Sequence, residues 1–151
     1  MRIFLNWLKN FVKIFESKHA VKKDNIINQS AKFNQIVIGK ILEIKQHPNA
    51  DRLRLVKVDV GKAILDIVCG APNLEVDQLV PVALVGAILP NDIEIKEAEI
   101  RGVKSFGMLC AEDELGLGKD HNGIMILSNN AKIGQKLVDY LDLKEGYKRT
   151  N

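Results

Sequence analysis

Hydrophobic and polar residues alternate over residues 54–60, which predicts a β-strand with one buried face. A turn signal, HPNAD, precedes this strand at residues 47–51. Pro48 pushes the residue before it toward extended geometry, while Asn49 and Asp51 favour an Asx-type turn. The pattern therefore indicates a turn leading directly into a half-buried strand. The two expected faces carry, respectively, Val56, Val58 and Val60, and Leu55, Lys57 and Asp59.

Other short segments have the same β character and are separated by Gly, Pro and Asn turns. Short helices are expected at Glu112–Leu115 and Gln135–Leu141. Several short strands without a long helix between them predict an all-β fold with short helices, namely a five-stranded Greek-key barrel of the OB-fold type. The expected strands are Gln35–Lys45, Leu53–Val60, Ala63–Val68, Leu79–Val85, Ile93–Ile100 and Met108–Ala111.

The first 16 residues have a different, helical periodicity, with an apolar stripe flanked by lysines. They predict an amphipathic helix docked on its own domain or on a partner. A basic helix at a membrane surface and a targeting peptide are the alternatives. Residues 17–34 are polar and predict a linker. The stripe is formed by Phe4, Trp7, Leu8, Phe11, Ile14 and Phe15.

The net charge of +3 conceals an uneven distribution. Residues 1–34 carry +5, residues 35–141 carry −3 and residues 142–151 carry +1. The predicted β domain is therefore slightly acidic, so global electrostatics do not favour nucleic acid. Any RNA affinity should depend on local basic clusters and on the basic leader.

Three motifs occur in order along the chain: HPNADRLRLVKVDVG (47–61), IVCGAPN (67–73) and RGVKSFGMLCAEDELGLG (101–118). With them, the chain resembles the tRNA-binding OB domain of the bacterial phenylalanyl-tRNA synthetase β subunit. The wider family includes free-standing tRNA-binding proteins. We expect this domain to span residues 35–143, with a tail at 144–151.

The opening NWLKNFV (6–12) resembles the start of the same β subunit, although the longer helical segment that the family has before its OB domain is missing. This favours a stand-alone protein over an excised piece. In the whole synthetase, the resemblance implies that aminoacylation belongs to the α subunit and editing to later β-subunit domains. We therefore expect no active site in this chain by itself.

Basic residues follow the turn at 47–51 and form the first candidate RNA-binding group. OB-folds use the loop between their first two strands to hold ligand, so Asn49 is a candidate contact as well as a turn residue. A groove that tracks an RNA backbone and an ordinary solvated strand face explain the basic residues equally well. These residues are Arg52, Arg54 and Lys57.

The segment RGVKSFGM forms the second candidate group. The resemblance implies that Arg101, Lys104, Ser105 and Met108 lie on the RNA-facing side. The two basic residues would contact phosphates, and the Ser105 hydroxyl would donate a hydrogen bond. Phe106 stands where the family commonly has a polar or acidic residue; it is either a stacking platform for a base or a hydrophobic plug.

Other chemistry-bearing residues receive structural interpretations. His47 is expected to stabilise its turn, with RNA contact as the alternative. Cys69 and Cys110 are expected in or near the core of a protein from a reducing compartment. The acids at 112–114, with Asp120 and His121, suit a helix N-terminus better than a metal site. No nucleotide-binding or zinc motif is present, so we expect no cofactor and no metal.

The sequence therefore predicts a cytoplasmic, non-catalytic tRNA-binding module that makes weak, shape-directed contacts to the RNA backbone. The expected partners are tRNA and a synthetase α subunit or other synthetase domains, without a membrane. The rival function is a protein-docking or homodimerising OB module with little RNA binding, which the acidic domain favours.

Overall fold

Seven strands form two antiparallel sheets within residues 35–141, the part of the chain that the computed structural model describes. The predicted helix at 1–16, the linker at 17–34 and the tail at 144–151 lie outside these residues. The strands are β1 (Ile36–Gln46), β2 (Arg54–Asp59), β3 (Ile64–Cys69), β4 (Leu79–Ala83), β5 (Ala98–Ile100), β6 (Val103–Ser105) and β7 (Met108–Leu109).

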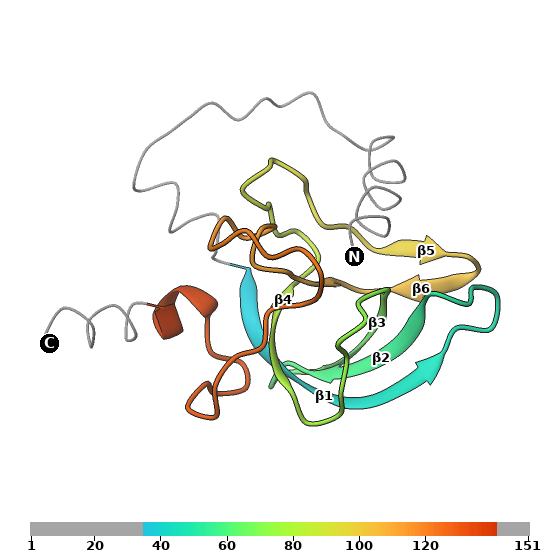
Figure 1. Cartoon of the computed structure of the whole chain (residues 1–151), viewed down its shortest axis with the longest axis horizontal. Coiled ribbons are helices and arrows are strands. Elements are labelled where there is room, and N and C mark those ends of the chain that lie inside the picture. The colour runs from blue at the N-terminus through green and yellow to red at the C-terminus, as the bar shows by residue number, and fades with distance from the viewer. Residues whose placement is uncertain (1–34, 142–151) are drawn as a thin grey trace, which may run out of the picture.

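The main sheet has the strand order β3-β2-β1-β4-β7 and curls strongly (Figure 1). β1 is central because its first half pairs with β4 and its second half with β2. The register shifts between Ile41 and Glu43, a β-bulge that increases the bend of the strand. As a result, the two edge strands, β3 and β7, contact each other. The coarse prediction of a mostly β fold built on five short strands is confirmed.

The predicted alternation of β2 is also confirmed. Val56 and Val58 are buried, whereas Lys57 between them is exposed. Apolar residues are buried in two clusters, one of which contains these valines. The second cluster joins the start of β1 to residues 83–140 and includes Ile38 and Leu137. Burial of these side chains is the main stabilising contribution to such a sheet.

A seam of hydrogen bonds joins the outer edge of β3 to the segment between β6 and β7. The Phe106 amide donates to the Asp66 carbonyl oxygen over 2.8 Å, and the Val68 amide donates to Ser105 Oγ over 3.0 Å. Ser105 Oγ in turn lies 3.3 Å from the Gly107 carbonyl oxygen. The seam satisfies backbone groups of β3 that an open sheet edge would leave unpaired.

Three of the local predictions need correction. The strand expected at Ile93–Ile100 is reduced to β5, because residues 87–95 form a turn in which the Ile95 amide bonds to the Ala87 carbonyl oxygen. β6 was not predicted as a strand. Residues 112–116 form turns instead of a helix, while the C-terminal helix is present only at 137–141. Within the described residues, no helix is long and apolar enough to cross a membrane.

Candidate nucleic-acid interface

The β1–β2 loop at residues 47–53 is held in shape by the end of β1. The His47 amide bonds to the Leu53 carbonyl oxygen over 3.1 Å. The Gln46 side-chain amide lies 3.1 Å from the Ala50 carbonyl oxygen and 3.0 Å from that of Asp51. The turn predicted at 47–51 is present, but hydrogen bonds of His47 and Gln46 order it, in place of the predicted side-chain contacts of Asn49 and Asp51.

This loop also docks on the β5–β6 hairpin, which is distant in sequence but lies at the same end of the molecule (Figure 1). His47 is buried, and its Nε2 lies 2.9 Å from the Ile100 carbonyl oxygen. The Asn49 side-chain amide donates to the Arg101 carbonyl oxygen over 2.9 Å. The structural interpretation of His47 is therefore confirmed, and the two candidate RNA-binding groups meet at this contact.

Arg101 and Gly102 form the two-residue turn between β5 and β6. Both have positive φ, 52° for Arg101 and 87° for Gly102, and Ile100 pairs with Val103 across the turn. Positive φ at both central positions is the requirement of a type I′ turn, which favours Asn-Gly. An arginine in the left-handed region costs about 1–2 kcal/mol relative to a residue that tolerates this region. The turn therefore exposes the side chain of Arg101 although the backbone conformation of this residue is strained.

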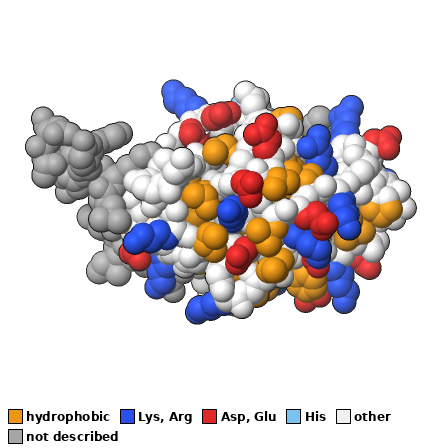
Figure 2. Space-filling model, turned by 90° about the horizontal axis from the view of Figure 1, so that it is seen from below, with side chains coloured by type: hydrophobic (Ala, Val, Ile, Leu, Met, Phe, Trp, Pro, Cys, Tyr) orange, Lys and Arg blue, Asp and Glu red, His pale blue; other side chains and the backbone are white. Residues whose placement is uncertain are grey.

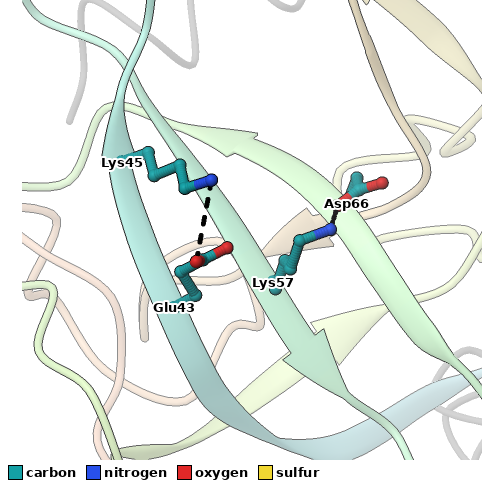
Figure 3. A network of polar contacts seen from close by, with 4 residues as sticks. All are labelled: Glu43, Lys45, Lys57 and Asp66. Carbon is teal, nitrogen blue, oxygen red and sulfur yellow. Dashed lines mark hydrogen bonds and ion pairs between the residues drawn. The ribbon is translucent and has the colours of Figure 1, made fainter.

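A row of alternating charges crosses the first three strands (Figure 3). Lys57 on β2 is the register partner of Glu43 on β1 and of Asp66 on β3. Lys57 Nζ lies 2.9 Å from Asp66 Oδ1, and this hydrogen bond and charge raise the pKa of Lys57. Lys45 makes a longer ion pair, 3.7 Å, with Glu43. Both lysines of this row therefore already form ion pairs with carboxylates of the same sheet.

A groove of about 330 Å³ lies over the same strands and is flanked by β6. Its lining combines three ammonium groups with apolar side chains and the half-buried ring of Phe106. A surface of this kind offers cations for a backbone and a flat apolar face for a base. The lining residues are Glu43, Lys45, Leu55, Lys57, Asp66, Ile67, Val68, Val103, Lys104 and Phe106.

The predicted site residues do not all face the same way. Arg54 and Lys57 are three positions apart on β2, so their side chains leave opposite faces of the sheet. Ser105 and Met108 are buried, each 2% exposed, and Ser105 belongs to the β3 seam. Arg54 and Phe106 are half-buried, and the remaining candidates are exposed: Asn49, Arg52, Lys57, Arg101 and Lys104.

The arginines and lysines differ in their electrostatic surroundings. Among residues 35–141, Arg52, Arg54 and Arg101 make no ion pair, whereas the lysines of the groove do. The Lys104 pair, with Glu97, measures 3.8 Å. Figure 2 shows one face on which basic, acidic and hydrophobic side chains are intermixed. No single-sign field of the kind that steers long-range association is visible on that face.

Sequence reasoning missed three charged residues of the groove, Glu43, Lys45 and Asp66. Each lies next to Lys57 only through the pairing of β1 with β2 and of β2 with β3. The one local signal was their strand parity, because Glu43 and Lys45 lie two positions apart on an amphipathic strand. Their closeness to Lys57 required the register.

The remaining candidate chemistry has structural roles. Cys69 and Cys110 are free and buried, which confirms their predicted core position; burial raises the pKa of the Cys69 thiol to about 12. The acids at 112–114 do not begin a helix. Glu114 is buried, and its Oε1 accepts the Ala111 amide over 2.6 Å. Within residues 35–141, no three His, Cys, Asp or Glu side chains gather as a metal site.

Comparison with known proteins defines the class of this domain. Residues 36–136 match the family described as putative tRNA binding domain, and the chain belongs to this family. Within it, the chain is of the phenylalanine–tRNA ligase β-subunit type, as the motifs predicted. It is 46% identical over 154 residues to that subunit of Nitratidesulfovibrio vulgaris, covering 95% of this chain and 19% of the relative.

The β subunit of Chlorobaculum tepidum is 44% identical over 157 residues, covering 94% of this chain and 19% of the relative. The chain thus spans about a fifth of the length of these curated relatives. Among solved structures, a MetRS-related protein from Pyrococcus horikoshii matches with a TM-score of 0.56 at 18% identity, over 77% of this chain and 99% of that one. That likeness is one of fold.

Proposed function

We propose that this chain binds tRNA as a non-catalytic module and acts in aminoacylation. Its membership of the tRNA-binding domain family and its phenylalanine–tRNA ligase β-subunit type support this function. The binding would rest on contacts to the phosphate backbone, made in the cytoplasm beside a synthetase α subunit or other synthetase domains. Phosphate contacts supply affinity without reading sequence, which suits a module that recognises the shape of tRNA.

We further propose that the fold is a complete OB barrel. The strand order β3-β2-β1-β4-β7, with contact between β3 and β7, matches the five-stranded Greek-key arrangement. OB-folds bind oligonucleotides over the face of their second and third strands, between the loops that flank it. Here the corresponding face carries the groove, and the β1–β2 loop and the β5–β6 hairpin flank it.

The observation that carries the function is the conformation of Arg101. It occupies a left-handed position that Asn or Gly would occupy without strain, it is exposed, and its guanidinium makes no ion pair within residues 35–141. Strain of this kind supports a functional role, because nothing in the turn itself requires an arginine. A phosphate group is a suitable ligand for an unpaired guanidinium.

In the proposed complex, Arg52 and Arg101 grip phosphates at the loop end, and Arg54 adds charge where β2 begins. The RNA then follows the groove past Lys57 and Lys104, with a base against the ring of Phe106 and with Asn49 at the entrance. Ser105 and Met108 are buried, so they do not contact RNA in this complex. They instead fix the position of the segment that carries Lys104 and Phe106.

The test replaces Arg101 by Asn. An Asn-Gly pair is preferred in a type I′ turn, so the free energy of unfolding should stay the same or rise, at most by about 1–2 kcal/mol. The affinity for tRNA should nevertheless fall about tenfold, and the salt dependence should decrease by the share of one phosphate group. Lys62→Asn, in the exposed turn between β2 and β3, is the control. A more stable variant with unchanged tRNA affinity would contradict the proposal.

The net charge of −3 over residues 35–141 favours a second candidate, a docking or homodimerising module. Its signature in the same experiments would be a mass that rises with protein concentration, together with tRNA retention too weak to show salt dependence. Sedimentation of the full chain with and without bulk tRNA separates the two functions.

A further inference from the structure

His47 is a buried polar side chain whose two ring nitrogens are both engaged. It is 3% exposed, and its Nδ1 lies 2.9 Å from the Asn49 amide nitrogen. A ring nitrogen that accepts an amide hydrogen carries no proton of its own, so Nε2 is the protonated one. Nε2–H therefore donates to the Ile100 carbonyl oxygen, 2.9 Å away. These two bonds fix the position of the ring.

The Nε2 bond joins the β1–β2 loop to the β5–β6 hairpin, and the Nδ1 bond fixes the ring to the Asn49 backbone within the loop. Ile100 is the residue directly before Arg101, and Asn49 stands three residues before Arg52. Asn49 completes the connection, because its side-chain amide donates to the Arg101 carbonyl oxygen over 2.9 Å. The imidazole and Asn49 together form a clamp, hereafter the His47–Asn49 clamp, between two elements about 50 residues apart in sequence.

We propose that His47 is a positioning residue for RNA binding: through the His47–Asn49 clamp, it holds the loop that carries Arg52 against the turn that carries Arg101. The inference rests on the proposed tRNA binding and adds that the two guanidinium groups act as one unit. His47 itself is too deeply buried to contact RNA. Its contribution is preorganisation, which reduces the entropy that the two loops would otherwise lose when RNA binds.

The geometry requires an imidazole, because one bond uses the δ position and the other uses the ε position. Asparagine places an acceptor near the Nδ1 position and retains the bond from the Asn49 amide. Glutamine places a donor near the Nε2 position and retains the bond to Ile100. His47→Asn and His47→Gln therefore each keep one of the two imidazole bonds, and His47→Ala keeps neither, while the Asn49 side-chain bond to Arg101 is retained in all three variants.

The experiment is a double-mutant cycle between His47 and Arg101, measured on the full chain with bulk tRNA by fluorescence anisotropy. We expect His47→Ala to weaken binding about tenfold, and the two conservative variants to weaken it less. Arg101→Ala should cost several-fold less in the His47→Ala background than in the wild type, because a guanidinium that is no longer positioned has less to lose. Thermal unfolding is followed in parallel for every variant.

His121→Ala is the matched control, since among residues 35–141 the His121 ring is bonded only within its own turn, over 3.4 Å to the Lys119 carbonyl oxygen. Equal costs of Arg101→Ala in both backgrounds would overturn the positioning role and leave tRNA binding intact. A wild type without affinity for tRNA would overturn the proposed function, and the positioning role with it. If His47→Ala fails to fold, the cycle is run with His47→Asn and His47→Gln, where the same additivity would overturn the inference.

Discussion

Two regions of this domain present cations: the strand face, with the groove lysines Lys45, Lys57 and Lys104, and the loop end, with Arg52 and Arg101. They differ in whether carboxylates pair with these cations. On the strand face, each groove lysine has a carboxylate partner, at 3.7 Å for Lys45, 2.9 Å for Lys57 and 3.8 Å for Lys104. At the loop end, Arg52 and Arg101 have no such partner within residues 35–141. The two regions therefore differ in whether an acidic neighbour pairs with each cation.

This comparison shows why the net charge of a domain is a poor guide to its RNA affinity. An ammonium group that already contacts a carboxylate must give up that interaction before it can bind a phosphate, so its net gain is smaller. A guanidinium held without an acidic partner has no such cost and forms a bidentate contact. A domain with a net charge of −3 can therefore bind RNA, provided that its unpaired cations lie close together.

The largest expected effect tests this division directly. Replacing Arg52 and Arg101 together by Ala should weaken tRNA binding roughly a hundredfold, because the change removes two charge-assisted hydrogen-bonding groups. The slope of log affinity against log salt should fall by about 1.4–1.8. Replacing Lys57 and Lys104 together should cost only a few-fold. The measurement is a salt titration of tRNA binding between about 50 and 200 mM.

Equal reductions in affinity for the arginine pair and the lysine pair would remove the distinction between the two regions. A larger reduction for the lysine pair would move the main RNA contact from the loop end to the groove. Thermal unfolding of both double variants is the control for folding, since all four side chains are exposed.

The strands of the main sheet could be predicted from the sequence because their signal is local. The alternation over 54–60 and the turn at 47–51 are both present in the structure, since each depends on neighbours within a few positions. β6 could not be predicted in this way. Its three residues follow an Arg-Gly pair, which is not a preferred type I′ turn, and they are ordered by pairing with β5 and by the seam with β3.

The candidate site was predictable in its composition but not in its arrangement. The loop and the segment at 101–108 were both identified as candidates, yet the hydrogen bond between Asn49 and Arg101 joins residues 52 positions apart. The same limit applies to Ser105, whose hydroxyl looks like a phosphate donor in the sequence. In the structure its partner is a backbone amide of β3, which no local pattern indicates.

Ser105 gives the second prediction, which asks whether this residue belongs to the binding surface or to its support. Ser105→Ala leaves the buried Val68 amide without its acceptor, so the free energy of unfolding should fall by about 1–3 kcal/mol. The salt slope of tRNA binding should not change, because every group that binds phosphate is retained. Chemical denaturation measures the first effect and the salt titration the second.

Ser128→Ala is a suitable control, because Ser128 is exposed and the loss of its hydroxyl leaves its own amide bonded to the Tyr140 hydroxyl. It should cost much less stability than Ser105→Ala. The opposite result for Ser105→Ala, full stability with a reduced salt slope, would place the hydroxyl in direct contact with RNA.

The smallest expected effect has the opposite sign and comes from removing an acid. Asp66→Asn deletes the carboxylate that holds Lys57, and the pKa of Lys57 should move back toward its ordinary value. That value is still far above neutral pH, so the ammonium keeps its charge and becomes free to contact phosphate. We expect tRNA affinity to rise about two- to threefold, with a steeper salt slope.

Asp77→Asn is a closely matched control, because it makes the same change in net charge and releases Lys40, which does not line the groove. If both variants bind tRNA equally well, the gain comes from net charge alone, and the pairing of Lys57 does not restrain binding. A gain confined to Asp66→Asn would show that a carboxylate of the strand face lowers the contribution of Lys57 to tRNA affinity. No such carboxylate pairs with Arg52 or Arg101 within residues 35–141, and this is the difference between the two regions.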